Sequence, residues 1–354
     1  MRLPSRLQDL PPKAARLCLD VERFTRHGLG LNLKGKSLLV ALSGGADSTA
    51  LLCCLHYLSP RLDARILAAH VDHGLRPESG RDADHCRDLC AALSVPLRTV
   101  RLDVAGLARQ GRTGIEEAGR EARYGFFRQV LAKEGLDLLL TAHQLNDLAE
   151  DALMRLIRGA GWPELAGMPA HDPERRLLRP LLLTPGAELR EFLKLIGAPW
   201  REDPSNVDQA FLRNRVRHSI LPLFLRENPG FLESIARLWR IAALDREFFG
   251  GLRAGLEIHH DTETNEFRLP LDRLLELHPA VRLRVYKSLL DALGPGQALW
   301  ENLTRLEEAV KSRSTGSVIE FPGDKQIAVE HKDLVCRIAA RSSPLHPPSR
   351  RDSR

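Results

Sequence analysis

The feature that most constrains the fold is a regular alternation of short apolar runs with helical stretches between Ser37 and Arg158. Four apolar runs have the length and composition of strands, and they cover 37–42, 65–71, 97–102 and 137–142. Stretches with helical periodicity follow them, at 49–58, 80–93, 115–131 and 147–158. Such an alternation needs crossover connections, so it predicts a parallel sheet covered on both faces, with ligands at the carboxyl ends of the strands.

Beyond Gly159 the pattern changes. A helix is expected after Thr184, which can act as N-cap to Pro185, and Gly197 is expected to end it. Residues 228–293 are mainly helical in period, whereas 317–338 alternate like strands. The predicted fold class is therefore α/β: a Rossmann-like parallel sheet, then a smaller, mainly helical domain and a short β-containing C-terminal segment.

The length of 354 residues favours more than one domain. The expected division is an N-terminal leader at 1–36, the α/β domain at 37–225 and the helical domain at 226–340. Residues 341–354 are rich in Ser, Pro and Arg, and this composition predicts a disordered tail.

Charge and composition restrict the class of protein only loosely. The net charge of +6 and the pI near 9.1 are a mild bias toward a polyanionic partner, shared by many basic proteins that bind no nucleic acid. None of the six cysteines forms a C-x-x-C pair, and buried, reduced thiols are expected. No signal peptide and no run of about 18 apolar residues is present, so a soluble cytoplasmic protein is expected.

The sharpest motif lies between the first expected strand and the first expected helix, and it reads Ser43-Gly44-Gly45-Ala46-Asp47-Ser48. The glycines let the backbone turn tightly and bring its N–H groups against an anion, and the helix N-terminus adds the positive end of its dipole. The serine hydroxyls can donate to phosphate, and Asp47 can hold a magnesium ion. Because the Gly-Lys-Ser/Thr of ordinary P-loops is missing, the motif predicts a nucleotide site of another type rather than a plain turn.

Polar clusters follow the second and fourth expected strands. The first cluster is His70-Val71-Asp72-His73-Gly74-Leu75-Arg76, which suits either a metal site or solvated loop residues. The second is His143-Gln144-Leu145-Asn146-Asp147-Leu148-Ala149-Glu150-Asp151.

In the second cluster, Asn146 is expected to cap the helix, so that Asp147 and Glu150 share one face of its first turn. Such carboxylates complement the helix dipole without any further role. However, this turn would open on the same edge of the sheet as the phosphate motif. The acidic turn therefore also predicts a site for a magnesium ion or an amino-acid ammonium group.

Two sets of arginines are candidate anion-binding groups. Arg120 and Arg123 precede Tyr124 on one expected helix and can reach one anion together, or pair with the glutamates of their own helix, Glu116, Glu117 and Glu121. The densest basic segment holds Arg213, Asn214, Arg215, Arg217 and His218. That segment is typical of a solvated face or of contacts to nucleic-acid phosphates.

Together these motifs resemble the tRNA(Ile)-lysidine synthetase family of the PP-loop superfamily, the N-type ATP pyrophosphatases. The resemblance is carried by the clusters at 43–48 and 70–76, by the Arg120/Arg123–Tyr124 helix, and by four further motifs: Arg158-Gly159-Ala160-Gly161, Leu165-Ala166-Gly167-Met168, Asp203-Pro204-Ser205-Asn206, and Arg213-Asn214 with Arg217-His218. It runs in order over 37–224 and is weaker to 338, and the chain looks like a short form of the family.

The resemblance implies an ATP-dependent ligase that joins the side-chain amine of free lysine to C2 of the wobble cytidine in tRNA(Ile) with a CAU anticodon. ATP would be split into AMP and pyrophosphate through an adenylated base, with Mg²⁺ as cofactor. Residues 37–225 would form the PP-loop ATP pyrophosphatase domain, and 226–340 would bind tRNA. The resemblance leaves a homodimer open.

The roles that the resemblance implies fall on three sets of residues. The catalytic set is Asp47, His143, Asp147, Glu150, Arg120 and Arg123. The set that binds ATP is Ser43, Gly44, Gly45, Ala46, Asp47 and Ser48, with Asp47 as magnesium ligand. The set that binds tRNA is His73, Arg76, Arg213, Asn214, Arg217 and His218.

One departure from the family pattern concerns the acidic turn. The family usually shows His-His-x-Asp-Asp-Gln-x-Glu-Thr where this chain has residues 143–151, so Asn146 replaces a carboxylate and supplies no charge. Three alternatives remain open: another PP-loop enzyme such as a tRNA thiolase, which normally needs cysteines near the nucleotide; a small-molecule amidotransferase-type ligase; and a tRNA-binding protein with an inactive nucleotide site.

Overall fold

The computed structural model describes residues 3–339 apart from 73, 75–78, 112–113 and 203–210. The chain divides into two compact units, Met1–Ala243 and Leu244–Arg354, with the division inside helix α10 (Phe231–Ala254). The expected domain limits after residues 36, 225 and 340 stay predictions. The expected tail at 341–354 and the loop at 203–206 lie outside the described residues.

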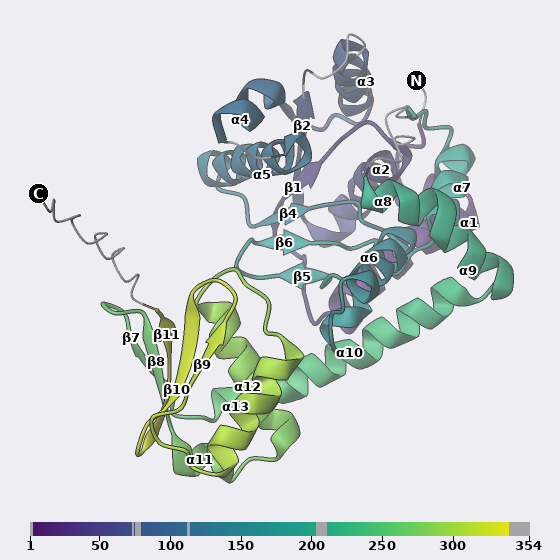
Figure 1. Cartoon of the computed structure of the whole chain (residues 1–354). Helices are drawn as coiled ribbons and strands as arrows, with labels where there is room; N and C mark the ends of the chain where they lie inside the picture. Colours follow the sequence, from purple (N-terminus) through teal and green to yellow (C-terminus); the bar gives the residue numbers. More distant parts are fainter. Residues whose placement is uncertain (1–2, 73, 75–78, 112–113, 203–210, 340–354) are drawn as a thin grey trace, which may run out of the picture. The chain divides into compact units, whose positions relative to one another are not determined.

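The first unit is built on one six-stranded sheet in the order β3-β2-β1-β4-β6-β5 (Figure 1). All neighbouring strands are parallel except β5, which runs antiparallel to β6. The strands are β1 Ser37–Ala41, β2 Arg65–Asp72, β3 Leu97–Arg101, β4 Leu138–Leu140, β5 His171–Asp172 and β6 Leu177–Leu178. The predicted parallel α/β sheet is thus confirmed, and its first four strands are the four predicted ones.

Helices cover both faces of this sheet, because side chains along β1 alternate between two apolar clusters. Leu38 and Val40 pack with α1, α2, α3 and α7, whereas Leu39 packs with α5 on the opposite face. The helices are α1 Pro12–Arg23, α2 Ala46–Leu62, α3 Ser79–Ala92, α4 Val104–Gly111, α5 Ile115–Glu134, α6 Leu145–Ile157, α7 Gly186–Ile196, α8 Leu212–Arg215 and α9 Leu221–Glu227. Short turns of other helix types are η1 Leu7–Asp9, η2 Phe24–Gly28, η3 Glu164–Ala166 and η5 Val216–Ile220.

The limits of α7 differ slightly from those predicted. Pro185, not Thr184, is the N-cap, because Pro185 has extended backbone angles (φ −61°, ψ 138°) and the helix begins at Gly186. Gly197 ends the helix in the left-handed conformation (φ 70°), as predicted.

Among the described residues, the second unit contains the end of α10, three further helices and a five-stranded antiparallel sheet in the order β7-β8-β11-β10-β9. The helices are α11 Leu271–Leu275, α12 Pro279–Ala292 and α13 Trp300–Lys311, and the strands are β7 His259–Asp261, β8 Glu266–Pro270, β9 Val318–Phe321, β10 Lys325–Val329 and β11 Asp333–Ile338. The C-terminal strands were predicted, whereas the β7–β8 hairpin lies in a stretch whose period indicated helix. Its partner β11 comes far later in the chain, where Leu334 pairs with Leu269. Among the described residues, no helix is both long and apolar enough to span a membrane.

Leu39 tests whether the packed centre of the first sheet determines the stability of the first unit. Its side chain is fully buried in the middle of β1, so Leu39→Ala is expected to cost about 2–5 kcal/mol in the free energy of unfolding. Leu156→Ala on α6 is the control, since Leu156 is 57% exposed. Urea unfolding followed by circular dichroism measures both, and an equal effect of the two variants would contradict this account of the core.

Candidate active site

The phosphate motif forms the turn between β1 and α2. The Ser48 hydroxyl closes this turn: it donates to the carbonyl oxygen of Gly45 (3.1 Å), accepts from the backbone N–H of Ser43 (3.1 Å) and lies 2.9 Å from the Ser43 hydroxyl. Helix α2 begins at Ala46 with Gly45 as N-cap, and no side chain caps it. The first backbone N–H groups of α2 therefore lie beside a tight turn without a capping side chain, and they can donate to an anion.

Gly44 is required at its position for two reasons. Its φ of 87° lies in the left-handed region, and a Cβ there would come within 3.3 Å of the Cys86 sulfur. The Gly44 carbonyl also accepts a hydrogen bond from the backbone N–H of Arg201 (3.0 Å). The turn is thus held from behind by α3 and by the segment that follows α7.

Asp47 is the residue of this turn that best suits a cation. Its Oδ1 atom is buried and has no hydrogen-bond partner among the described residues. Burial, and then the nearby Asp147 carboxylate, raise the pKa of Asp47 to about 6, although Arg190, Arg217 and a hydrogen bond from Gln144 act in the opposite direction. A buried carboxylate oxygen without a donor fits the hard, oxygen-seeking Mg²⁺ that a nucleotide triphosphate brings.

The acidic turn at the start of α6 is capped differently from the prediction. Gln144 is the N-cap: its side-chain oxygen accepts from Asn146 N–H (2.7 Å), and Asp147 Oδ2 accepts from Gln144 N–H (3.1 Å). The prediction that Asn146 caps the helix was wrong, because the extended backbone ends at Gln144. Asn146 instead accepts from the backbone N–H of Gly186 (3.1 Å) and joins α6 to the start of α7.

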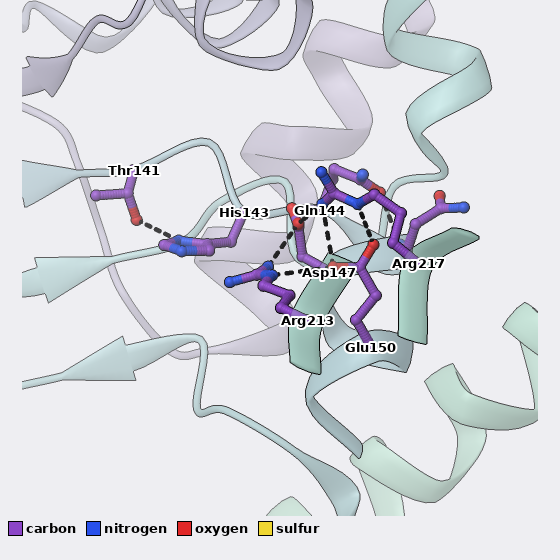
Figure 2. A network of polar contacts seen from close by, with 8 residues as sticks. Thr141, His143, Gln144, Asp147, Glu150, Arg213 and Arg217 are labelled. Atoms are coloured by element: carbon purple, nitrogen blue, oxygen red, sulfur yellow. Dashed lines mark hydrogen bonds and ion pairs between the residues drawn. The ribbon is translucent and has the colours of Figure 1, made fainter. Parts of the chain in front are cut away.

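Two arginines pair with both carboxylates of this turn (Figure 2). Arg213 reaches Asp147 Oδ1 through Nη2 (2.7 Å) and Glu150 Oε2 through Nε (3.0 Å). Arg217 reaches the same carboxylates at 3.0 Å and 2.6 Å. Because Asp147 and Glu150 are 8% and 1% exposed, the guanidinium groups supply the charge compensation that burial demands.

His143 follows β4 and lies beside these two carboxylates and two arginines. Its Nδ1 is 2.9 Å from the Thr141 hydroxyl (Figure 2). Burial lowers the pKa of His143 to about 4; the Asp147 carboxylate acts in the opposite direction, and Arg179, Arg213 and Arg123 lower the pKa further. The imidazole is therefore neutral near pH 7 and retains a lone pair that can accept a proton.

The phosphate turn and the acidic turn share one edge of the sheet. They follow β1 and β4, which are adjacent and parallel, and the carboxylates of Asp47 and Asp147 influence each other directly. The juxtaposition expected from the sequence is thereby confirmed. The phosphate turn therefore lies next to the carboxylates of Asp147 and Glu150, whose charges are offset by two arginines.

The other predicted site residues lie as follows. Arg120 and Arg123 stand over the Tyr124 ring, 5.3 and 5.7 Å from its centroid, and Arg123 and Arg213 influence each other electrostatically. Asn214 in α8 is partly buried and His218 in η5 is exposed. His73 and Arg76 lie outside the described residues.

Sequence reasoning missed two residues, Gln144 and Arg179. Gln144 contacts Asp47 and also caps α6, but an amide before a helix is a weak signal. Arg179 follows β6, a strand of only two residues that no periodicity could reveal.

Gly44→Ala tests the geometry of the phosphate turn. The left-handed backbone and the contact with Cys86 should distort the turn and lower ATP affinity by about tenfold or more, for a strain of roughly 1–2 kcal/mol. Gly80→Ala is the matched control, since nothing lies within 4 Å of a Cβ there. Equilibrium ATP binding measures the effect, and unchanged affinity in Gly44→Ala would show that the turn does not hold nucleotide.

Asp47 also makes a pH prediction. Because its pKa is raised to about 6, the carboxylate ionises as pH rises through that value, and Mg²⁺-dependent ATP affinity should rise with it. The same ionisation costs folding energy, since the folded pKa lies above the unfolded one, so Asp47→Asn should melt higher than wild type above that pH. Binding and melting curves at pH values on both sides of about 6 measure the two effects. If the ATP affinity and melting temperature of wild type change with pH no more than those of Asp47→Asn, the raised pKa of Asp47 is contradicted.

Comparison with known proteins agrees with this geometry. The family model of the PP-loop domain matches residues 20–224. A curated tRNA(Ile)-lysidine synthase from Nitratidesulfovibrio vulgaris is 44% identical over 325 residues, which cover 86% of this chain and 93% of that protein.

Other relatives of the same name are longer. Those from Deinococcus deserti and Geobacter sulfurreducens are 32% and 33% identical, and the chain spans 54% and 66% of their lengths. A solved U34-tRNA thiolase from Methanococcus maripaludis, with a [4Fe-4S] cluster, shares the fold with a TM-score of 0.54 at 20% identity, over 64% of this chain and 77% of that one. The matched PP-loop region contains both turns of the candidate site, and the chain belongs to the PP-loop family and, within it, to the tRNA(Ile)-lysidine synthases.

Proposed function

We propose that this protein is an ATP-dependent ligase that converts the wobble cytidine of a CAU-anticodon tRNA(Ile) to lysidine. The observation that carries the proposal is the shared edge where Asp47 of the phosphate turn meets Asp147 of the acidic turn. The relative that supports it is named a tRNA(Ile)-lysidine synthase and is matched over 93% of its length.

The chemistry explains why ATP is needed. The oxygen on C2 of cytosine is a poor leaving group, so direct attack by an amine stalls. In the proposed first step this oxygen attacks the α-phosphate of ATP, and the bond to the bridging oxygen of pyrophosphate breaks. In the second step the lysine Nζ attacks C2, loses a proton, and AMP leaves with the former C2 oxygen.

The phosphate turn would act in the first step. The N–H groups at the start of α2 and the hydroxyls of Ser43 and Ser48 would hold the β- and γ-phosphates as negative charge builds on the departing pyrophosphate. Asp47 would hold Mg²⁺, which when bound offsets phosphate charge.

The acidic turn would act in the second step by binding lysine. Free lysine carries two ammonium groups and one carboxylate. Asp147 and Glu150 can accept from an ammonium group, while Arg213 or Arg217 can turn from these carboxylates to the lysine carboxylate. Once the reacting Nζ has lost its proton, the positive charges of Arg213, Arg217 and the α-ammonium group match the negative charges of Asp147, Glu150 and the lysine carboxylate, so every buried charge can be paired.

His143 would accept the proton that the attacking amine loses. Its Nδ1 lies against Thr141, which leaves Nε2 as the atom that can face the amine. The low pKa of about 4 keeps the ring unprotonated and ready to accept, and makes it a weak base that acts only at close range.

The tRNA would be held by several further residues. Arg120 and Arg123 would contact phosphate near the base, and His73, Arg76, Asn214 and His218 would contact the RNA, together with residues 226–340. A homodimer and a cytoplasmic location, where tRNA is found, also remain part of the proposal.

No observation favours a thiolase. The six cysteines are free and buried, and burial raises the pKa of Cys86, whose sulfur lies behind the phosphate turn, to about 12. Among the described residues, no three His, Cys, Asp or Glu side chains gather in a group that could hold a metal ion. The cysteines therefore act as packing groups, and the thiol of Cys86 is protonated near neutral pH.

The decisive experiment is mass analysis of the wobble cytidine after incubation of the protein with ATP, lysine and unmodified transcript. Wild type should add one lysine to that nucleoside, and Asp47→Ala should lower the rate by about 100-fold, as for loss of a major electrostatic group. Asp20→Ala on α1, whose side chain is 47% exposed, is the control with the same loss of charge.

Two results would contradict the proposal. Full lysine incorporation by Asp47→Ala would remove the phosphate turn from the mechanism. Binding of tRNA by wild type, with no modified nucleoside and no AMP, would identify a binding protein with an inactive nucleotide site.

A further inference from the structure

Arg179 is a buried cation that neither the sequence nor the proposed steps account for. It follows β6, at the same edge of the sheet as the two turns, and its side chain is 95% buried, with 5% exposed. One amino group, Nη1, donates to the carbonyl oxygen of Pro169 (2.6 Å). The Nε–H group is buried and has no partner among the described residues.

The surroundings of Arg179 are themselves positive. Tyr124 carries Arg120 and Arg123 on its ring, and Arg179 lies in the same electrostatic neighbourhood. Burial lowers the pKa of both Arg123 and Arg179, and the charge of Arg120 lowers each further. Tyr124 raises the pKa of both, and the carboxylates of Asp172 and Asp151 raise that of Arg179. A guanidinium does not lose its proton in a protein, so the three charges persist together.

The nearest carboxylates are already paired elsewhere. Asp151 bonds Arg155 (2.8 Å), and Asp172 lies 3.7 Å from Arg175. Among the described residues, Arg123 and Arg179 therefore carry positive charge in a partly desolvated place without a carboxylate in an ion pair with them, whereas Arg120 is exposed. Buried charges without a counterion are costly, and a phosphate, with several acceptor oxygens, is the ligand that guanidinium groups match best.

The position of this group suggests where that phosphate lies. Strand order places β4 between β1 and β6, so Arg179 is two strands, or about 10 Å, from the phosphate turn. Arg123 and Arg179 both act on His143, which follows β4. The excess charge thus lies on the side of His143 away from Asp47.

We propose that Arg179 and Arg123, beside Tyr124, form a second phosphate subsite that binds one oxyanion of the reacting complex, either a backbone phosphate of the tRNA or the α-phosphate of the nucleotide. The inference rests on the proposed function, and it assigns Arg179 a role in binding. The unpartnered Nε–H and the charge excess are the observations that carry it.

The test compares Arg179→Gln, Arg179→Lys and Arg123→Gln with the control Arg16→Gln, which removes an exposed charge from α1. Kd for tRNA is measured from about 50 to about 200 mM salt, and Kd for ATP is measured in parallel. If the subsite binds RNA phosphate, Arg179→Gln and Arg123→Gln weaken tRNA binding about tenfold and reduce the slope of log Kd against log salt by about one. Arg179→Lys should restore part of the slope, and the control should match wild type.

The other outcomes distinguish an RNA phosphate from a nucleotide phosphate, and a failure of the subsite from a failure of the proposed function. A rise in Kd for ATP with an unchanged tRNA slope would assign the subsite to the nucleotide. If Arg179 only clamps Pro169, its variants lose thermal stability and leave both Kd values unchanged, and this overturns the proposal. Arg123→Gln does not touch Pro169 and decides the question if the Arg179 variants do not fold. Wild type that binds ATP but no tRNA would refute the proposed function, and the ATP measurement would then decide the subsite alone.

Discussion

The site depends on two carboxylates held close together at the ends of neighbouring parallel strands. Asp47 and Asp147 repel each other when both are ionised, and burial adds to the cost. The fold tolerates this arrangement because two arginines from α8 and η5 compensate the acidic turn, while Asp47 keeps one oxygen without a donor. The remaining imbalance suits a bound cation, and the pKa of Asp47, raised to about 6, predicts that the phosphate turn responds to pH near that value.

Charge in the first unit is ordered along the edge of the sheet. A carboxylate with one unpartnered oxygen follows β1, a group of two acids and two arginines follows β4, and excess guanidinium charge lies around Arg179 after β6. Such a gradient would place a cation-bound polyphosphate at one side, a zwitterion in the middle and a phosphate at the other side. The proposed reaction brings together ligands of these three kinds.

The departure at Asn146 has a structural explanation. In place of the family's usual carboxylate, the amide oxygen accepts a hydrogen bond from Gly186 and fixes the start of α7 against α6. A second replacement, Gln144, both caps α6 and donates to Asp47, so it connects the two turns. Neither replacement removes a carboxylate from the pair formed by Asp147 and Glu150.

The sequence alone was sufficient to predict the parallel sheet, its first four strands and the phosphate turn, because periodicity and glycine placement act over a few residues. The shared edge of the two turns also followed, since parallel topology puts strand ends together. Cap positions were less accurate: extended backbone at Gln144 and Pro185 moved them by one or two residues.

Tertiary structure alone decided the contacts between distant segments. Arg213 and Arg217 looked like a solvated or RNA-binding face, yet they bond carboxylates 63–70 residues earlier in the chain. Hairpin β7–β8 depends on its pairing with β11. The proposed role of Arg179 depends on Tyr124 and on arginines that are distant in the sequence. Local pattern encodes helices, strands and turns, whereas charge compensation between remote residues depends on desolvation, which exists only once the chain has folded.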